Sequence, residues 1–221
     1  MDYTGSSLGV LISGNDEQRH AGFLLQDDGK KEFVHLAWHK YLFNDSEAEF
    51  LEHGFAGYIP FDCPTFSDLE REELVSFIKT VYKKNMKSVP YSIIGDGSSA
   101  FFNLDGSMPV KDAGLGLTCA TFVMSIFSVQ SYPLIDESSW LPRADDKQWH
   151  MKILDGMRKF KVDPVHISVQ EKYIGIAPRF RPEEVIGCAA NFSYHPHRFC
   201  SAVSFGEAVL SKMRAEGLMK A

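Results

Sequence analysis

The chain has 221 residues, of which 44% are hydrophobic, and this suits one large globular domain with a proper core. Its formal charge of −6 argues against a nucleic-acid partner or attraction to an anionic membrane. Four scattered cysteines predict no disulfide scaffold, and the absence of a basic start and a long apolar run predicts no secretory signal or stable membrane anchor, so we expect a cytoplasmic protein as synthesised.

The N-terminal part of the chain predicts strands and a tight hairpin. Residues 8–13 form a short apolar run that ends at Gly14-Asn15-Asp16, as is typical of a strand followed by a turn. Residues 20–26 and 32–37 are two more strand-like runs. Asp28-Gly29 between them is a preferred centre for a two-residue hairpin turn.

This hairpin brings two histidines together. With the turn centred on Asp28-Gly29, residue 27 pairs with residue 30, Gly22 with His35, and residue 20 with residue 37. Strand side chains alternate between faces, so His20 and His35 are expected on one face as diagonal neighbours, about 7–8 Å apart at their backbones. His39 lies just beyond the second strand with the same even–odd register, and it is an alternative partner for His20.

Helices are expected in the middle of the chain. Ser67-Asp68-Leu69-Glu70 forms a capping box, and apolar residues at helical spacing follow to about residue 85. Residues 95–116 predict a long loop, in which Asp112 is a candidate to line a cleft. A helix begins at Cys119, and another is expected over residues 144–159.

Residues 161–221 are interpreted as an extension packed on a core formed by residues 1–160, within a single domain. Short strands are expected around 165–169 and 173–176. Arg181-Pro182-Glu183-Glu184 has the proline and acids of a helix start, and a last helix is expected over 205–216.

Cys119 is the best nucleophile candidate. A thiol at a helix N-terminus faces unpaired amides and the positive end of the helix dipole, which favours the thiolate, and the same amides can hold an oxyanion. The alternative is a small buried hydrophobic residue on a core helix. A thiol also needs a base, and an imidazole needs an orienting partner, so the order histidine, histidine, cysteine suits a cysteine hydrolase if the fold brings the three together.

Three short segments resemble the permuted branch of the NlpC papain-like superfamily, whose best-known members are the lecithin:retinol acyltransferase-like proteins. The segments are His20-Ala21-Gly22-Phe23-Leu24-Leu25, Phe33-Val34-His35-Leu36-Ala37 and Cys119-Ala120-Thr121-Phe122-Val123. The resemblance implies that Cys119 is the nucleophile, His20 the base and His35 its orienter. It also implies an α+β, circularly permuted papain-like fold, with an antiparallel sheet against the cysteine helix and a C-terminal α/β extension.

The match covers residues near 20–37 and 116–127 and departs from the family at two points. Acyltransferase-like members usually carry Asn-Cys-Glu-His at the nucleophile, where this chain has Thr118-Cys119-Ala120-Thr121. Many also carry a C-terminal membrane anchor, which is not expected here. Both differences weaken a lipid-acyl function. The amides at Thr118 and Cys119 are the expected oxyanion and cleft groups.

The resemblance implies acyl transfer through a thioester, without a cofactor. Because the wider superfamily mostly cuts amide bonds, we expect a peptidase or amidase that acts on a peptide or a cell-wall (peptidoglycan) peptide. A cell-wall substrate would require export as an effector by a signal-independent secretion system, with a delivery or immunity protein as partner. The alternatives are a thioester-using acyltransferase, a lipid or thioester hydrolase, and a non-enzymatic binding module on the same fold.

The cluster His195-Pro196-His197 with Cys200 contains three potential metal ligands in six residues, and Cys188 is near in sequence. Zinc sites usually take four ligands in separated pairs. We therefore expect no metal site and interpret His-Pro-His as a turn.

Overall fold

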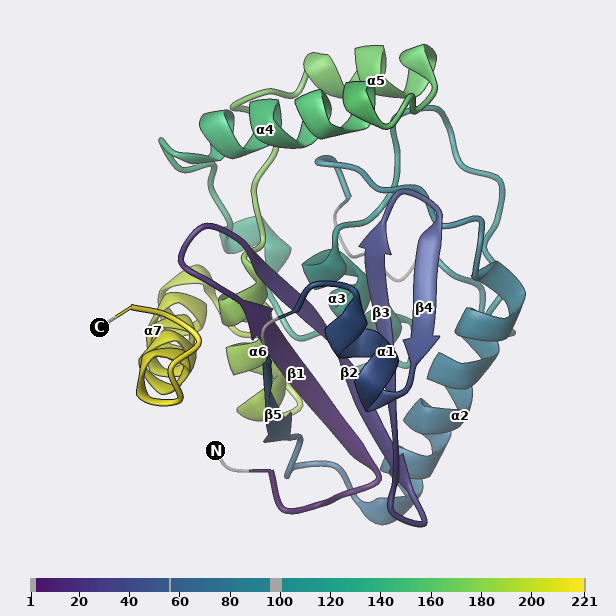
Figure 1. The fold of residues 1–221 in the computed structure, drawn as a ribbon, viewed down its shortest axis with the longest axis vertical. Coiled ribbons are helices and arrows are strands. Elements are labelled where there is room, and N and C mark those ends of the chain that lie inside the picture. Colours follow the sequence, from purple (N-terminus) through teal and green to yellow (C-terminus); the bar gives the residue numbers. More distant parts are fainter. Residues whose placement is uncertain (1–2, 56, 96–100, 221) are drawn as a thin grey trace.

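The structure is a computed structural model that describes residues 3–55, 57–95 and 101–220. It is an α+β fold built on a five-stranded antiparallel sheet in the order β4-β3-β2-β1-β5 (Figure 1). The strands are β1 (Leu8–Gly14), β2 (Arg19–Asp27), β3 (Lys30–Trp38), β4 (Tyr41–Asp45) and β5 (Tyr58–Asp62).

Helices cover both faces of this sheet. The short α1 lies on one face over β3 and β4, whereas α3 and α6 lie on the other, and α4 and α5 form a separate layer at one end (Figure 1). The bounds are α1 (Glu47–Glu52), α2 (Asp68–Asn85), α3 (Cys119–Val129), α4 (Asp146–Lys159), α5 (Pro164–Glu171), α6 (Pro182–Ala190) and α7 (Phe199–Ala215), with a 3₁₀ turn over Glu137–Ser139.

The predicted hairpin turn is confirmed. Asp28 and Gly29 both have positive φ, 45° and 77°, as the preferred two-residue turn requires, and Asp27 pairs with Lys30. The β2–β3 ladder ends at Phe23–Val34, so neither the predicted pairing of Gly22 with His35 nor that of residues 20 and 37 belongs to it. The first residues of β2, 19–22, therefore have no ladder partner in β3.

Strand alternation divides the sheet side chains between two cores. Ala21 and Phe23 belong to the large core, where Phe23 packs against Phe122 of α3. Leu24 and Phe33 belong to a smaller core on the α1 face. His20 has the parity of Leu24 and His35 that of Phe33, so both imidazoles lie on the α1 face.

The helices expected in the middle of the chain are present. Ser67 and Glu70 form the predicted capping box of α2, α3 begins at Cys119, and α4 occupies most of the range expected for it.

The C-terminal part differs from expectation. The strands predicted around 165–169 and 173–176 are wrong, because residues 164–171 form α5 and a turn follows. The missed signal is Asp163-Pro164: the Asp163 side chain accepts the Val165 N–H as a helix cap, and proline occupies the first turn. Helix α7 begins at Phe199 rather than at 205.

Residues 161–221 contribute to the main core instead of only covering it. Every residue of α6 is buried, and the helix contacts β1, β2 and α3 on one side and α7 on the other. Gly187 permits the close approach of α7, since a Cβ there would lie 2.7 Å from the Cβ of Phe205. Among the described helices, none has the length and apolar character needed to cross a membrane.

Candidate active site

The start of α3 is fixed by reciprocal threonine caps. Thr118 Oγ1 accepts the Thr121 N–H at 3.1 Å, and Thr121 Oγ1 accepts the Thr118 N–H at 2.8 Å. This capping box explains why the helix begins at Cys119. It also corrects one expectation, because the Thr118 amide is already used and does not remain as an oxyanion donor.

The sulfur of Cys119 lies between the helix start and β2. The residue is 5% exposed, and the backbone amides of Ala21, Ala120 and Cys119 itself interact with the sulfur and favour its anionic form. Burial outweighs these groups and raises the pKa of Cys119 to about 11. The expected thiolate is therefore wrong for the free protein, in which Cys119 is a thiol at neutral pH.

The contact with Ala21 places the sulfur next to the backbone of His20, while the His20 ring points to the opposite, α1 face of the sheet. Because the β2–β3 ladder ends at Phe23, β3 does not cover this part of β2, and the start of α3 packs there. His20 is the residue that precedes Ala21. The fold thus brings the backbone of the predicted base next to the predicted nucleophile.

His20 and His35 are in contact, and a third residue extends the pair. His20 Nε2 lies 2.9 Å from His35 Nδ1, and His35 Nε2 lies 3.0 Å from Asp45 Oδ2. An ionised carboxylate only accepts hydrogen bonds, so His35 Nε2–H donates to Asp45. Neutral His35 then accepts at Nδ1 from His20 Nε2–H. This leaves Nδ1 of His20, the ring nitrogen nearer its backbone, as the free basic nitrogen.

Burial holds both imidazoles in the neutral form. His20 is 6% exposed and His35 0% exposed, and desolvation is the main cause that lowers the pKa of each. The Asp45 carboxylate opposes this effect at His35. Phe55 stacks on the His20 ring with centroids 4.8 Å apart and shields one ring face from water.

Among the described residues, no hydrogen bond joins the Cys119 sulfur to the His20 ring. The only hydrogen-bond partner of the His20 ring there is His35. The structure therefore brings His20 and His35 into contact and brings Cys119 to the adjacent residue of β2.

His39, the alternative orienter, lies elsewhere. Its Nδ1 accepts the Tyr91 N–H at 3.3 Å, and its ring contacts His166 with centroids 4.9 Å apart. Burial and the nearby His166 lower the pKa of His39 to about 4. The residue that continues the chain from His20 and His35 is Asp45.

Sequence reasoning missed Asp45 because its position depends on the β3–β4 ladder. That ladder pairs Phe33 with Asp45 and contains an irregularity between Leu36 and Trp38. An irregularity of this kind shifts the register, and neither strand carries a turn signal that predicts it. The only available signal was an acidic residue at the end of an apolar strand.

A narrow cavity of about 40 Å³ opens at Cys119. Its walls come from the turn before β2, the start of α3, the helix α4 and the segment before α6. They include Arg19, Tyr91, Thr118, Trp149, Lys152, Arg179 and Phe180. Asp112, which was expected to line the cleft, is exposed and is not part of these walls.

Of the two histidines that flank residue 196, His197 has a structural role and His195 is exposed. His197 Nε2 lies 3.0 Å from the Asn191 carbonyl oxygen, and His197 forms a bridge with Ile135. Within the described ranges, no group of three or more His, Cys, Asp or Glu side chains is arranged to hold a metal ion.

Comparisons of the chain with protein-family models, curated proteins and solved structures find no match.

Proposed function

We propose that this protein is a cysteine hydrolase that cleaves an amide bond through a thioester on Cys119, on a circularly permuted papain-like fold. His20 is the general base, and His35 and Asp45 orient it. The observation that carries the proposal is the buried His20–His35–Asp45 chain. Its free end belongs to the residue next to Ala21, whose amide interacts with the Cys119 sulfur.

The proposed proton path runs from Cys119 to His20. Because the His20 ring lies on the α1 face, stacked on Phe55, it must turn toward the sulfur before it can act. As the sulfur of Cys119 attacks the carbonyl carbon, its proton then passes to Nδ1 of His20. The negative charge moves to the carbonyl oxygen, which faces the amides of Cys119 and Ala120. The C–N bond then breaks, and His20 returns the proton to the leaving amine. Water attacks the thioester, His20 accepts its proton, and the acid and free thiol are released.

The resting state in this mechanism is a neutral pair. Burial raises the pKa of Cys119 to about 11, and burial lowers the pKa of His20, so thiol and imidazole are both uncharged at neutral pH. Proton transfer then accompanies attack instead of preceding it. His35 and Asp45 favour this transfer, because a carboxylate stabilises the imidazolium that forms.

The architecture supports the proposed fold type. The antiparallel sheet packs against the helix that carries the cysteine, and two histidines come from neighbouring strands of that sheet. We propose a peptide or cell-wall peptide as the substrate class. A cell-wall substrate requires export by a signal-independent system, with a delivery or immunity protein as partner.

The test is acylation by p-nitrophenyl acetate in a Cys200→Ser background, which removes the exposed thiol. We expect a stoichiometric burst of p-nitrophenolate and one acetyl group on Cys119 by peptide mass spectrometry. Cys119→Ala abolishes the burst, and His20→Ala slows it about 100-fold or more. His195→Ala, at an exposed histidine, is the matched control and leaves it unchanged.

Two outcomes would contradict the proposal. Acetylation of Cys119 that is unaffected by His20→Ala shows ordinary thiol chemistry, and a folded protein without a burst points to a binding module. Transfer of the acetyl group to added glycine ethyl ester in preference to water points instead to an acyltransferase.

A further inference from the structure

The cavity at Cys119 contains a guanidinium without a polar partner. Among the described residues, the guanidinium of Arg179 makes no hydrogen bond and no ion pair, and its Nε is buried without a partner. It stacks on the ring of Trp149, with its central carbon 4.4 Å from the ring centroid. The Nε atoms of Arg143 and Arg181 are also buried without a partner, but their terminal nitrogens are paired. Polar groups in a protein interior are normally hydrogen-bonded, so a guanidinium that lacks any partner among the described residues marks a position for a ligand.

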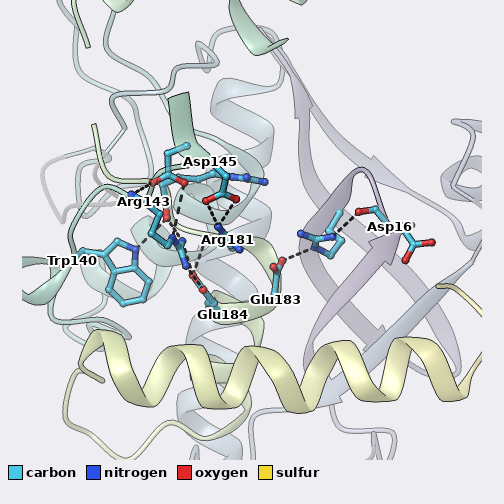
Figure 2. A network of polar contacts seen from close by, with 10 residues as sticks. Asp16, Trp140, Arg143, Asp145, Arg181, Glu183 and Glu184 are labelled. Carbon is cyan, nitrogen blue, oxygen red and sulfur yellow. Dashed lines mark hydrogen bonds and ion pairs between the residues drawn. The ribbon is translucent and has the colours of Figure 1, made fainter. Parts of the chain in front are cut away.

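The neighbouring arginines are all paired. Arg181 contacts both carboxylate oxygens of Asp145, at 2.8 and 2.7 Å. Arg143 contacts both oxygens of Glu184, at 2.6 and 3.1 Å, and Arg19 pairs with Glu183 at 2.8 Å. Figure 2 shows the Arg143–Glu184 and Arg181–Asp145 pairs around the start of α6. Arg179 differs from them in having no carboxylate within ion-pair distance among the described residues.

The same network fixes the backbone that carries Arg179. The Arg179 carbonyl oxygen accepts a hydrogen bond from Trp140 Nε1 at 3.1 Å and another from Arg143 Nη2 at 2.8 Å (Figure 2). With its backbone held from one side and its guanidinium stacked on Trp149, the side chain loses little further freedom on binding a ligand. Its charge also reaches the sulfur, because it is one of the groups that favour the anionic form of Cys119.

The charge on the cavity walls favours an anion. Arg19, Lys152 and Arg179 line the cavity, and Glu17 is the only acid among its lining residues within the described part of the chain. Arg19 is neutralised by Glu183, whereas Lys152 makes no ion pair with a described residue. A planar guanidinium matches a carboxylate in particular, since two parallel N–H groups meet its two oxygens.

We propose that Arg179 binds a carboxylate of the acyl donor, so that the substrate is an acidic peptide or amide whose cleaved carbonyl lies a few atoms from a carboxylate. Lys152 adds a second positive charge at the same cavity. This inference rests on the proposed function, because Cys119 is taken as the attacking atom. The carboxylate is either a free peptide C-terminus or an acidic side chain.

The experiment compares alkylation of Cys119 by iodoacetate, which carries a carboxylate, with alkylation by iodoacetamide, which carries a neutral amide in its place. In each reaction the sulfur forms a bond to carbon and iodide leaves. Rates are measured at one alkaline pH by peptide mass spectrometry of the whole protein. The ratio of the iodoacetate rate to the iodoacetamide rate at Cys119 is divided by the same ratio of rates at the exposed Cys200. This division corrects for the intrinsic reactivity of the two reagents.

We expect this normalised ratio to favour iodoacetate at Cys119 by about tenfold or more. Arg179→Gln should bring it close to one, and Arg179→Lys, which keeps the charge but not the planar fork, should give an intermediate value. Arg181→Gln is the matched control. It removes a cation two residues away that is already paired with Asp145, and the ratio should not change.

A ratio near one in the unmodified protein, or one that Arg179→Gln leaves unchanged, would overturn the proposal, and so would failure of either reagent to reach Cys119. None of these measurements requires turnover or His20. A missing p-nitrophenolate burst with a normal iodoacetate preference therefore counts against the hydrolase alone.

Protection from iodoacetamide then distinguishes the two sources of the carboxylate. Ala-Ala offers only a terminal carboxylate, and Ala-Glu amide only a side-chain carboxylate. Protection of Cys119 by one of them that is lost in Arg179→Gln identifies the source, and protection by neither contradicts the acidic-peptide substrate.

Discussion

Gly22→Ala tests whether the close approach of β2 and β3 holds the histidine pair together. A Cβ at residue 22 would lie 2.8 Å from the Cβ of His35 and 3.2 Å from the carbonyl oxygen of Val34. Non-bonded carbon atoms prefer separations of about 3.5–4.0 Å, so the strands must move apart by about 1 Å. Neither contact is the end of a flexible side chain, and His35 must move with its strand.

The expected cost is about 1–3 kcal/mol of unfolding free energy, as for other overpacked sites. For a chain of this size, calorimetry should show a Tm lower by about 2–4 °C for each kcal/mol. The 2.9 Å contact between His20 and His35 should lengthen beyond hydrogen-bond range, and the p-nitrophenolate burst should slow about 100-fold.

Gly29→Asn is the control for the same hairpin. No atom lies within 4 Å of a Cβ at Gly29, and asparagine tolerates the positive φ of this turn position. This variant should keep the Tm and the burst. A Gly22→Ala protein with a Tm within about 1 °C of the parent and an unchanged burst would refute the reasoning, since strain of about 1 kcal/mol or more must appear in one of the two measurements.

Asp45→Asn should slow the burst about tenfold or more, because a charge-assisted hydrogen bond to His35 becomes a neutral one, a loss of about 1–2 kcal/mol; an unchanged rate would remove Asp45 from the site. His39→Gln should leave the burst unchanged, because His39 contacts Tyr91 and His166 instead of His20, and a large loss would restore it as the orienter. Acidification should destabilise the protein: folding lowers the pKa of His20 and His35 below 6.5, so the unfolded chain binds protons that the folded chain does not. Below about pH 6.5 the unfolding free energy should fall by about 1.4 kcal/mol per pH unit for each of these histidines until its folded-state pKa is reached. Urea denaturation between pH 7.5 and 5 measures this slope, and a flat profile would contradict neutral burial of the pair.

Local signals predicted much of the fold. Asp28-Gly29 set the hairpin and its register, and the Ser67 and Glu70 capping box set the start of α2. These features involve residues close in sequence, whose backbone conformations depend on turn and cap chemistry. The predicted contact between His20 and His35 followed from the same register. The wrong strands at 165–169 and 173–176 came from apolar residues whose helix-start signal, Asp163-Pro164, was not recognised.

The site depended more on contacts between distant segments. The position of Cys119 at a helix N-terminus predicted a reactive thiolate, but burial raises the pKa of Cys119 to about 11, and the extent of burial is a property of the assembled core. Asp45 reaches His35 only because β4 pairs with β3 through an irregular ladder.

By itself, the sequence determined the short-range elements: the hairpin, the capped helices, the shared face of His20 and His35, and Cys119 at the start of a helix. Only the tertiary structure decided that the histidine chain ends at Asp45, that α6 belongs to the main core, and that the Arg179 guanidinium lines the cavity of Cys119 without a polar partner in the described part of the chain. The physical reason is that turn and cap conformations depend on a few neighbouring residues. Burial, pKa values and charge pairing depend on which distant segments exclude water from one another.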